Sequence, residues 1–186
     1  ASNVAGVDLT SGLSDMNYLR IQGLNGPIWA LIALDCHSYD IPQCAESGEQ
    51  TTREGLVAEI LTSQCSDGGW TLAGDTADVD MTAMALTALA AYKDDAEVKA
   101  AVDAALAYLS DAQQEDGGFM SWGTANSESC AQVIVALTAL GIDPAADARF
   151  TKAGGTAIDA LCAFASEGGG FRHSDEQTEP DGMATE

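Results

Sequence analysis

Three segments of the chain have the hydrophobic periodicity of amphipathic helices, with apolar residues along one face and polar residues on the other. The clearest stripe has the spacing i, i+4, i+7, i+8 and i+11 and consists of Val98, Val102, Ala105, Leu106 and Leu109. The corresponding residues are Leu56, Val57, Ile60 and Leu61 in the first segment and Ile158, Leu161, Cys162 and Ala165 in the third. The pattern predicts three helices that each expose one face to solvent.

Three other segments, residues 28–34, 81–91 and 131–140, are apolar almost all round. A helix of this composition must be covered on every side. Half-exposed helices that alternate with covered ones do not fit a simple four-helix bundle, but they fit a ring or solenoid of stacked pairs. The sequence therefore predicts an all-α fold, an α/α toroid or partial toroid of paired outer and inner helices.

A glycine-aromatic motif recurs between the paired helices. Its copies, Gly-Gly-Trp or Gly-Gly-Phe, begin at residues 68, 117 and 169, which are 49 and 52 residues apart. Glycine permits a tight turn and the ring can pack against the next repeat, so a structural role is favoured over ligand contact. The residues assigned to this repeat motif are Gln64, Gly68, Trp70, Gln113, Gly117, Phe119, Gly169 and Phe171.

Local signals mark where the inner helices begin and end. Pro27 suits the first turn of the first inner helix. Asp78 and Ser127 are expected to cap the next two, and Gly141 with Pro144 to end the third. A further inner helix is expected to begin in the last four residues.

The count of helices gives an opening inner helix, two complete pairs and a third outer helix. We therefore expect residues 1–186 to form a single α/α-toroid repeat domain that is a fragment of a longer protein. An incomplete ring exposes the apolar edges of its inner helices, so self-association through these edges is also expected.

The chain is strongly acidic, with 7 Lys plus Arg against 29 Asp plus Glu and a net charge of −22. This charge repels phosphate backbones, so nucleic acid is excluded as a partner. It can attract a cation or a basic protein, although a solvated acidic surface is the simpler interpretation. No apolar stretch reaches the length of a membrane span, and no signal peptide is present in the sequence.

Five cysteines have no Cys-x-x-Cys spacing, which disfavours a zinc ribbon or a dithiol redox site. Cys65, Cys130 and Cys162 lie in apolar helical segments and are expected to be buried. Cys36 and Cys44 flank a loop and can pair in an oxidising compartment, so their redox state stays open.

Residues 64–70 and 113–119 resemble the glutamine-to-aromatic repeat of the prenyltransferase/squalene oxidase family, which includes terpenoid cyclases; the third copy, 165–171, lacks the glutamine. The resemblance covers roughly residues 25–186. The closer likeness, through residues 80–86, 126–129 and 131–144, is to bacterial cell-surface proteins of this repeat family. It implies an extracellular or cell-surface location.

The toroid is shared by proteins of different function. Besides cyclases, it is used by cobalamin carriers, protein prenyltransferase β-subunits and thioester-containing complement-like proteins. His37 and His173 lack the spacing of a zinc set, and Ser47 takes the cysteine position of a thioester-like stretch. We predict no cofactor, with a cobamide or a divalent cation as the alternatives.

Residues 78–83 resemble the acid motif of squalene-hopene-type cyclases, in which a carboxylic acid protonates an alkene. The resemblance places Asp80 in the proton-donor position, with Asp78 beside it. Met81 stands where the motif has a further acid, and the chain has only 4 Phe, 3 Trp and 4 Tyr with which to stabilise a carbocation. Helix capping by either aspartate is the alternative.

Polar residues also gather at the predicted beginnings of the inner helices, namely Asp75, Asp78, Asp80, Asn126, Glu128 and Glu186. Their oxygens can bind a cation or another ligand, although no loop has the dense carboxylate pattern of a calcium site. The leading hypothesis is a non-catalytic domain of a bacterial surface protein that binds a small ligand or a protein segment there. A terpenoid-cyclase-like enzyme, a cobalamin-carrier-like domain and a structural spacer are the alternatives.

Overall fold

The computed structural model of the chain describes residues 3–185 and divides into two compact units. The first unit contains the residues up to 64 together with 71–74, and the second contains 65–70 together with the residues from 75 onward. Among the described residues, no helix is long and apolar enough to cross a membrane.

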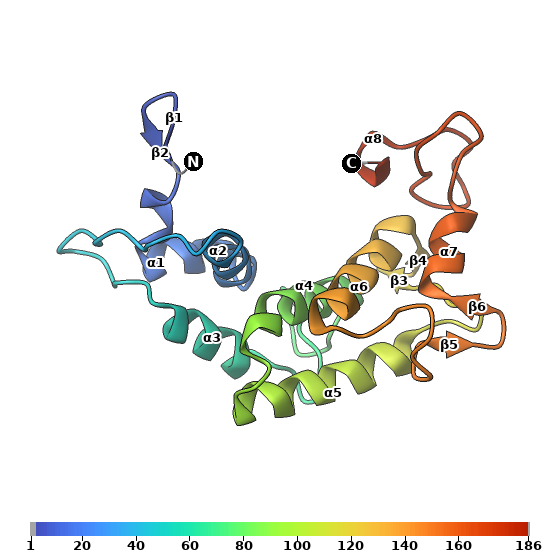
Figure 1. Cartoon of the computed structure of the whole chain (residues 1–186), viewed down its shortest axis with the longest axis horizontal. Coiled ribbons are helices and arrows are strands. Elements are labelled where there is room, and N and C mark those ends of the chain that lie inside the picture. The colour runs from blue at the N-terminus through green and yellow to red at the C-terminus, as the bar shows by residue number, and fades with distance from the viewer. Residues whose placement is uncertain (1–2, 186) are drawn as a thin grey trace. The chain divides into compact units, whose positions relative to one another are not determined.

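The first unit is built on one helix pair. Its elements are the hairpin of β1 (Asn3–Val4) and β2 (Val7–Asp8), the short helices η1 (Ser11–Leu13), α1 (Met16–Leu19) and η2 (Arg20–Gln22), and the helices α2 (Asn25–Asp35) and α3 (Arg53–Thr62). Leu31 of α2 and Leu56 of α3 are fully buried where the two helices pack together (Figure 1). Pro27 lies in the first turn of α2, as predicted.

An arginine joins the end of α2 to the start of α3. The Nε of Arg53 lies 2.6 Å from the carboxylate of Asp35, and its Nη2 donates to the carbonyl oxygens of Leu34 at 3.0 Å and Tyr39 at 2.9 Å. The carbonyl of Leu34 belongs to the last turn of α2, where carbonyl groups lack partners within the helix. The guanidinium therefore caps α2 while it fixes the start of α3.

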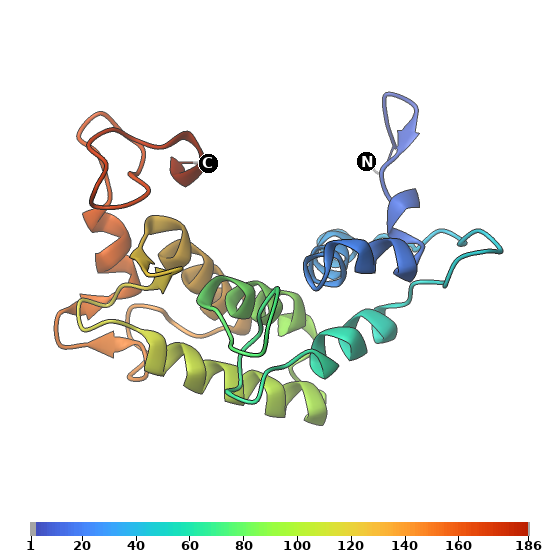
Figure 2. The same ribbon diagram turned by 180° about the vertical axis from the view of Figure 1, so that it is seen from behind.

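The second unit contains the remaining helices. Its elements are α4 (Val79–Leu89), η3 (Ala90–Tyr92), α5 (Ala96–Ala112), β3 (Met120–Ser121), β4 (Thr124–Ala125), α6 (Ser127–Leu140), β5 (Thr151–Lys152), β6 (Gly155–Thr156), α7 (Ala157–Ala163) and α8 (Gly182–Thr185). Helix α4 packs against both α5 and α6, and α6 also packs against α7. Figure 2, which views the molecule from behind, shows α5 alongside α4.

The same backbone clamp joins each glycine-aromatic turn to the helix that follows it. The carbonyl oxygens of Trp70, Phe119 and Phe171 accept from the backbone N–H groups of residues 78, 126 and 181, at 2.9, 3.4 and 2.8 Å. The N–H of Trp70 donates to the hydroxyl of Thr82, and the N–H of Phe171 to that of Thr185. Each turn is therefore tied to the first turn of the next inner helix.

The predicted stripe on α5 is confirmed, because all five of its apolar residues are buried. The prediction for α7 is wrong in phase: Ile158, Cys162 and Ala165 are exposed, while Ala157 and Ala160 are buried. The cause is close packing of α7 on the second glycine turn. A Cβ atom on Gly118 would lie 3.4 Å from that of Ala160, so Ala160 faces this turn.

The prediction that the inner helices are covered on every side holds for most of α4 but is wrong for α2, whose Trp29 is 50% exposed, and for one side of α6. Eight of the eleven residues of α4 are buried. Helix α6 leaves Val135 52% exposed, with Thr138 and Ala139 exposed on the same side. The difference arises because α4 packs against α5, α6 and β3, whereas α6 packs mainly against α4 and α7.

Most of the predicted helix ends are confirmed. Asp78 caps α4, Gly141 ends α6 in the left-handed conformation with φ of 79°, and α8 begins where a further inner helix was expected. Ser127 is not a cap, because the extended Asn126 before it accepts from the N–H of Ser129. Ser127 is instead the first residue of α6.

The prediction of an all-α fold omitted three small β-hairpins that the structure shows within residues 3–185, β1–β2, β3–β4 and β5–β6. Each of their strands has two residues. In two of these hairpins the turn consists of a residue and a following glycine that both have positive φ, as two-residue hairpin turns favour. The two turns are Ala5-Gly6 and Trp122-Gly123. Strands of two residues are too short to show the alternation by which a strand is predicted.

The cysteines follow the predictions only in part. Cys130 is buried, Cys65 is half-buried, and Cys162 is exposed because of the phase of α7. Cys36 and Cys44, for which pairing was left open, are both free thiols in the structure.

We expect Thr82→Val to lower the free energy of unfolding by about 1–3 kcal/mol, because it leaves the buried N–H of Trp70 without its 2.9 Å acceptor. Thr82→Ser should retain most of the stability. Thr138→Val, on the exposed side of α6, is the matched control and should change stability by less than about 0.5 kcal/mol. Urea denaturation measures the free energy of unfolding of all three variants. An equal loss of stability in Thr82→Val and Thr138→Val would contradict a role of Thr82 in the clamp.

Candidate functional site

The candidate site lies in the second unit, where α4 and α6 begin. Oδ1 of Asp78 accepts from the N–H of Met81 at 2.8 Å, and Oδ1 of Asn126 accepts from the N–H of Ser129 at 2.7 Å. The amide of Asn126 also donates to the carbonyl of Thr124 at 3.0 Å. Two of the predicted site residues are therefore helix caps, which fix the geometry of the residues that follow them.

Two other predicted site residues lie outside this arrangement. Asp75 is exposed in the loop before α4, where the hydroxyl of Thr76 lies 3.5 Å from its carboxylate. Glu186 lies outside the described residues.

Asp80 lies in the first turn of α4 and does not cap the helix. Its Oδ1 is buried and has no hydrogen-bond partner among the described residues. The partial positive charge at the beginning of a helix stabilises a carboxylate in the first turn. However, a buried carboxylate oxygen without a donor is unusual and calls for an explanation.

Two hydroxyl groups on elements that pack against α4 share the same property. Ser121 on β3 and Ser129 on α6 are buried, and their Oγ atoms have no hydrogen-bond partner among the described residues. Both β3 and α6 pack against α4. Three adjoining elements therefore each contribute one buried, unpaired oxygen atom.

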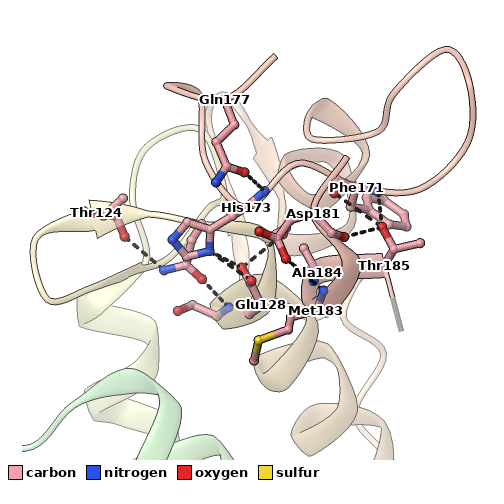
Figure 3. A network of polar contacts seen from close by, with 12 residues as sticks. Thr124, Glu128, Phe171, His173, Gln177, Asp181, Met183, Ala184 and Thr185 are labelled. Carbon is pink, nitrogen blue, oxygen red and sulfur yellow. Dashed lines mark hydrogen bonds and ion pairs between the residues drawn. The ribbon is translucent and has the colours of Figure 1, made fainter. Parts of the chain in front are cut away.

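A contact between a histidine and a carboxylate lies at the start of α6. Nδ1 of His173 is 2.9 Å from both carboxylate oxygens of Glu128, and Figure 3 shows the imidazole ring directed at this carboxylate. The backbone of His173 is held on both sides, since its carbonyl accepts from the N–H of Ser127 at 3.0 Å and its N–H donates to Gln177 at 3.0 Å. These contacts fix the position of the imidazole beside Glu128.

The repeat register explains which residues were missed. Asp80 and Glu128 are equivalent, because each lies two residues after the cap of its inner helix. Ser121 and His173 are equivalent too, each two residues after the aromatic residue of its turn. The contact of His173 with Glu128 was not predicted, because the two residues are 45 positions apart in the sequence.

Charge and burial also act on two neighbours of Asp80. Burial raises the pKa of the Cys130 thiol, and the carboxylates of Asp116 and Asp80 add to the effect. Burial also raises the pKa of Tyr108 to about 12, with a further contribution from Asp67, Asp78 and Asp80. Cys130 therefore stays a neutral thiol, which is a weak nucleophile.

Metal binding finds limited support in this geometry. Among residues 3–185, no group of three or more His, Cys, Asp or Glu side chains is placed to hold a metal ion. The carboxylates of Asp80 and Glu128 are the groups at this end that could bind a cation or a ligand with hydrogen-bond donors.

The raised pKa of Tyr108 makes stability depend on alkaline pH. The folded state holds this proton more tightly than the unfolded chain, so the stabilisation is complete below pH 10 and is lost as the pH rises to about 12. In Tyr108→Phe, unfolding by urea should depend less on pH across this window. An unchanged pH dependence in the variant would contradict the proposed linkage.

Comparison with known proteins agrees with this architecture. No curated protein matches the chain. A family model described as the prenyltransferase alpha-alpha toroid domain matches residues 14–185, which include helices α1 to α8, all three glycine-aromatic turns and the start of α4 and α6. The chain therefore belongs to the prenyltransferase alpha-alpha toroid family.

Proposed function

We propose that the chain is a non-catalytic ligand- or protein-binding domain of a bacterial surface protein, and that its site lies where α4 and α6 begin. The observation that carries the proposal is the set of unpaired oxygen atoms on Asp80, Ser121 and Ser129. About nine in ten buried polar groups in proteins have a hydrogen-bond partner. These three are among seven such atoms in the described residues, and their place on α4 and on two elements that pack against it fits a site that a ligand completes.

The chemistry of these groups indicates the kind of ligand. A carboxylate only accepts hydrogen bonds, and a hydroxyl can accept as well as donate. Asp80 and Glu128 also add negative charge to a chain whose net charge is already −22. The ligand is therefore a small molecule or a protein segment that presents hydrogen-bond donors or positive charge.

The surface-protein setting rests on the resemblance of residues 80–86, 126–129 and 131–144 to bacterial cell-surface members of the repeat family. An acidic surface suits an extracellular domain because net charge keeps a protein soluble. This setting is part of the proposal.

Asp80 also supports a second candidate, a terpenoid-cyclase-like enzyme with this residue as proton donor. The supporting observation is its carboxyl group, which has one buried and unpaired oxygen. Trp70 and Phe119 are fully buried within their turns, so their rings have no exposed surface to offer a substrate. A carbocation would find little aromatic stabilisation there, and we therefore favour binding over catalysis.

If Ser129 is a ligand-binding group, its replacement should stabilise the unliganded domain. Ser129→Ala removes a buried unpaired hydroxyl and should raise the free energy of unfolding by about 1 kcal/mol. Ser127→Ala is the matched control: its hydroxyl donates to Glu128 at 3.1 Å, so this variant should lose about 0.5–1.5 kcal/mol. Chemical denaturation measures the change in the free energy of unfolding of both variants. A lower free energy of unfolding in Ser129→Ala would mean that the hydroxyl of Ser129 has a structural role.

Native mass spectrometry of the protein purified from its own source tests the function directly. We expect a bound molecule in the wild type and in Asp75→Ala, in which only an exposed loop carboxylate is removed. The amount of this molecule bound to Asp80→Ala should be lower by a factor of about ten or more, because a charge-assisted hydrogen bond contributes about 1.5–3 kcal/mol. Equal occupancy in both variants would remove Asp80 from the site, and the release of a cyclised polyprenyl hydrocarbon would favour the enzyme.

A further inference from the structure

A separate hollow lies in the first unit, on the surface of α1 and α2. Its volume is about 430 Å³, and it is lined by ten residues of η1, α1, η2 and α2, none of which is charged. This volume falls within the roughly 300–1,000 Å³ that is typical of small-molecule sites. An uncharged hollow of this size contrasts with the net charge of −22 on the chain.

Two aromatic side chains line the hollow while they remain accessible. Tyr18 of α1 is 58% exposed and Trp29 of α2 is 50% exposed. Ala33 lies one turn after Trp29 on the same helix and is also an exposed lining residue. Exposed aromatic rings around an apolar hollow are a common feature of binding sites.

Close packing gives the hollow a fixed floor. A Cβ atom on Gly26 would overlap the backbone of Leu19, so α2 can approach α1 this closely only with glycine at position 26. Leu19 and Ala30, which also line the hollow, are buried. The floor of the hollow is therefore formed by packed backbone and core side chains.

The lining contains one unsatisfied polar atom. Oδ1 of Asn25, in the first turn of α2, is buried and has no hydrogen-bond partner among the described residues. Apolar sites usually contain a few such polar groups, which orient the ligand. A ligand that donates one hydrogen bond would satisfy this atom.

We propose that this hollow binds a small, uncharged aromatic molecule that carries one hydrogen-bond donor, with its ring against Trp29 and Tyr18 and its donor on Oδ1 of Asn25. The site is independent of the one proposed at the start of α4 and α6. A charged ligand is excluded because no lining side chain can compensate its charge.

N-phenyl-1-naphthylamine is a suitable probe, because it is an uncharged aromatic amine with one N–H group and its fluorescence rises in apolar surroundings. We expect the whole chain to bind one molecule. The matched probe 8-anilino-1-naphthalenesulfonate has the same ring system with a sulfonate group, and it should bind at least about tenfold more weakly.

Two variants test the position of the probe. Asn25→Leu removes the acceptor and should raise the Kd for the naphthylamine by about tenfold. Ala33→Phe fills the hollow and should abolish binding, while Ala139→Phe, the same change at an exposed position of α6, should leave it unchanged. Circular dichroism checks that each variant is folded.

The proposal is overturned if the wild type does not bind the naphthylamine, or if Ala33→Phe and Asn25→Leu both leave its Kd unchanged. Equal affinity for the two probes would overturn the uncharged class of ligand. Sedimentation gives the remaining outcome: a wild-type dimer that Ala33→Phe converts to a monomer would show that the hollow is covered by a second copy of the chain.

Discussion

The backbone clamp between each glycine-aromatic turn and the next inner helix is the constraint on which the second unit depends. Both the N–H and the C=O group of Trp70 are bonded to the first turn of α4, and Phe171 makes the same two contacts with α8. A buried backbone group without a partner costs free energy. The turn therefore fixes where the helix begins, and the buried rings of Trp70 and Phe119 hold the turn against the core.

This constraint also separates structural polar groups from those available for function. Asp78 and Asn126 are held in the caps of α4 and α6. Asp80 and Glu128 follow two residues later, at equivalent positions, yet their surroundings differ. Glu128 contacts His173, whereas one oxygen of Asp80 has no partner among the described residues. The carboxylates of Asp80 and Glu128 thus lie at the starts of α4 and α6 without capping these helices.

The two units offer different chemistry to ligands. The start of α4 and α6 combines carboxylates with hydroxyl groups, so it favours a ligand with donors or positive charge. The hollow on α1 and α2 has no charged side chain and favours an uncharged aromatic ligand. Each preference follows from the side chains of its own unit.

The sequence by itself determined the repeat, the alternation of outer and inner helices, the stripe of α5 and the cap at Asp78, because periodicity and capping depend on residues close together in the chain. Only the tertiary structure decided the face that α7 buries, the exposure of Val135 and the pairing of Glu128 with His173. The face that α7 buries carries Ala157 and Ala160, and Ala160 lies against Gly118 of the second glycine-aromatic turn. Such contacts join residues far apart in sequence, so no local pattern encodes them.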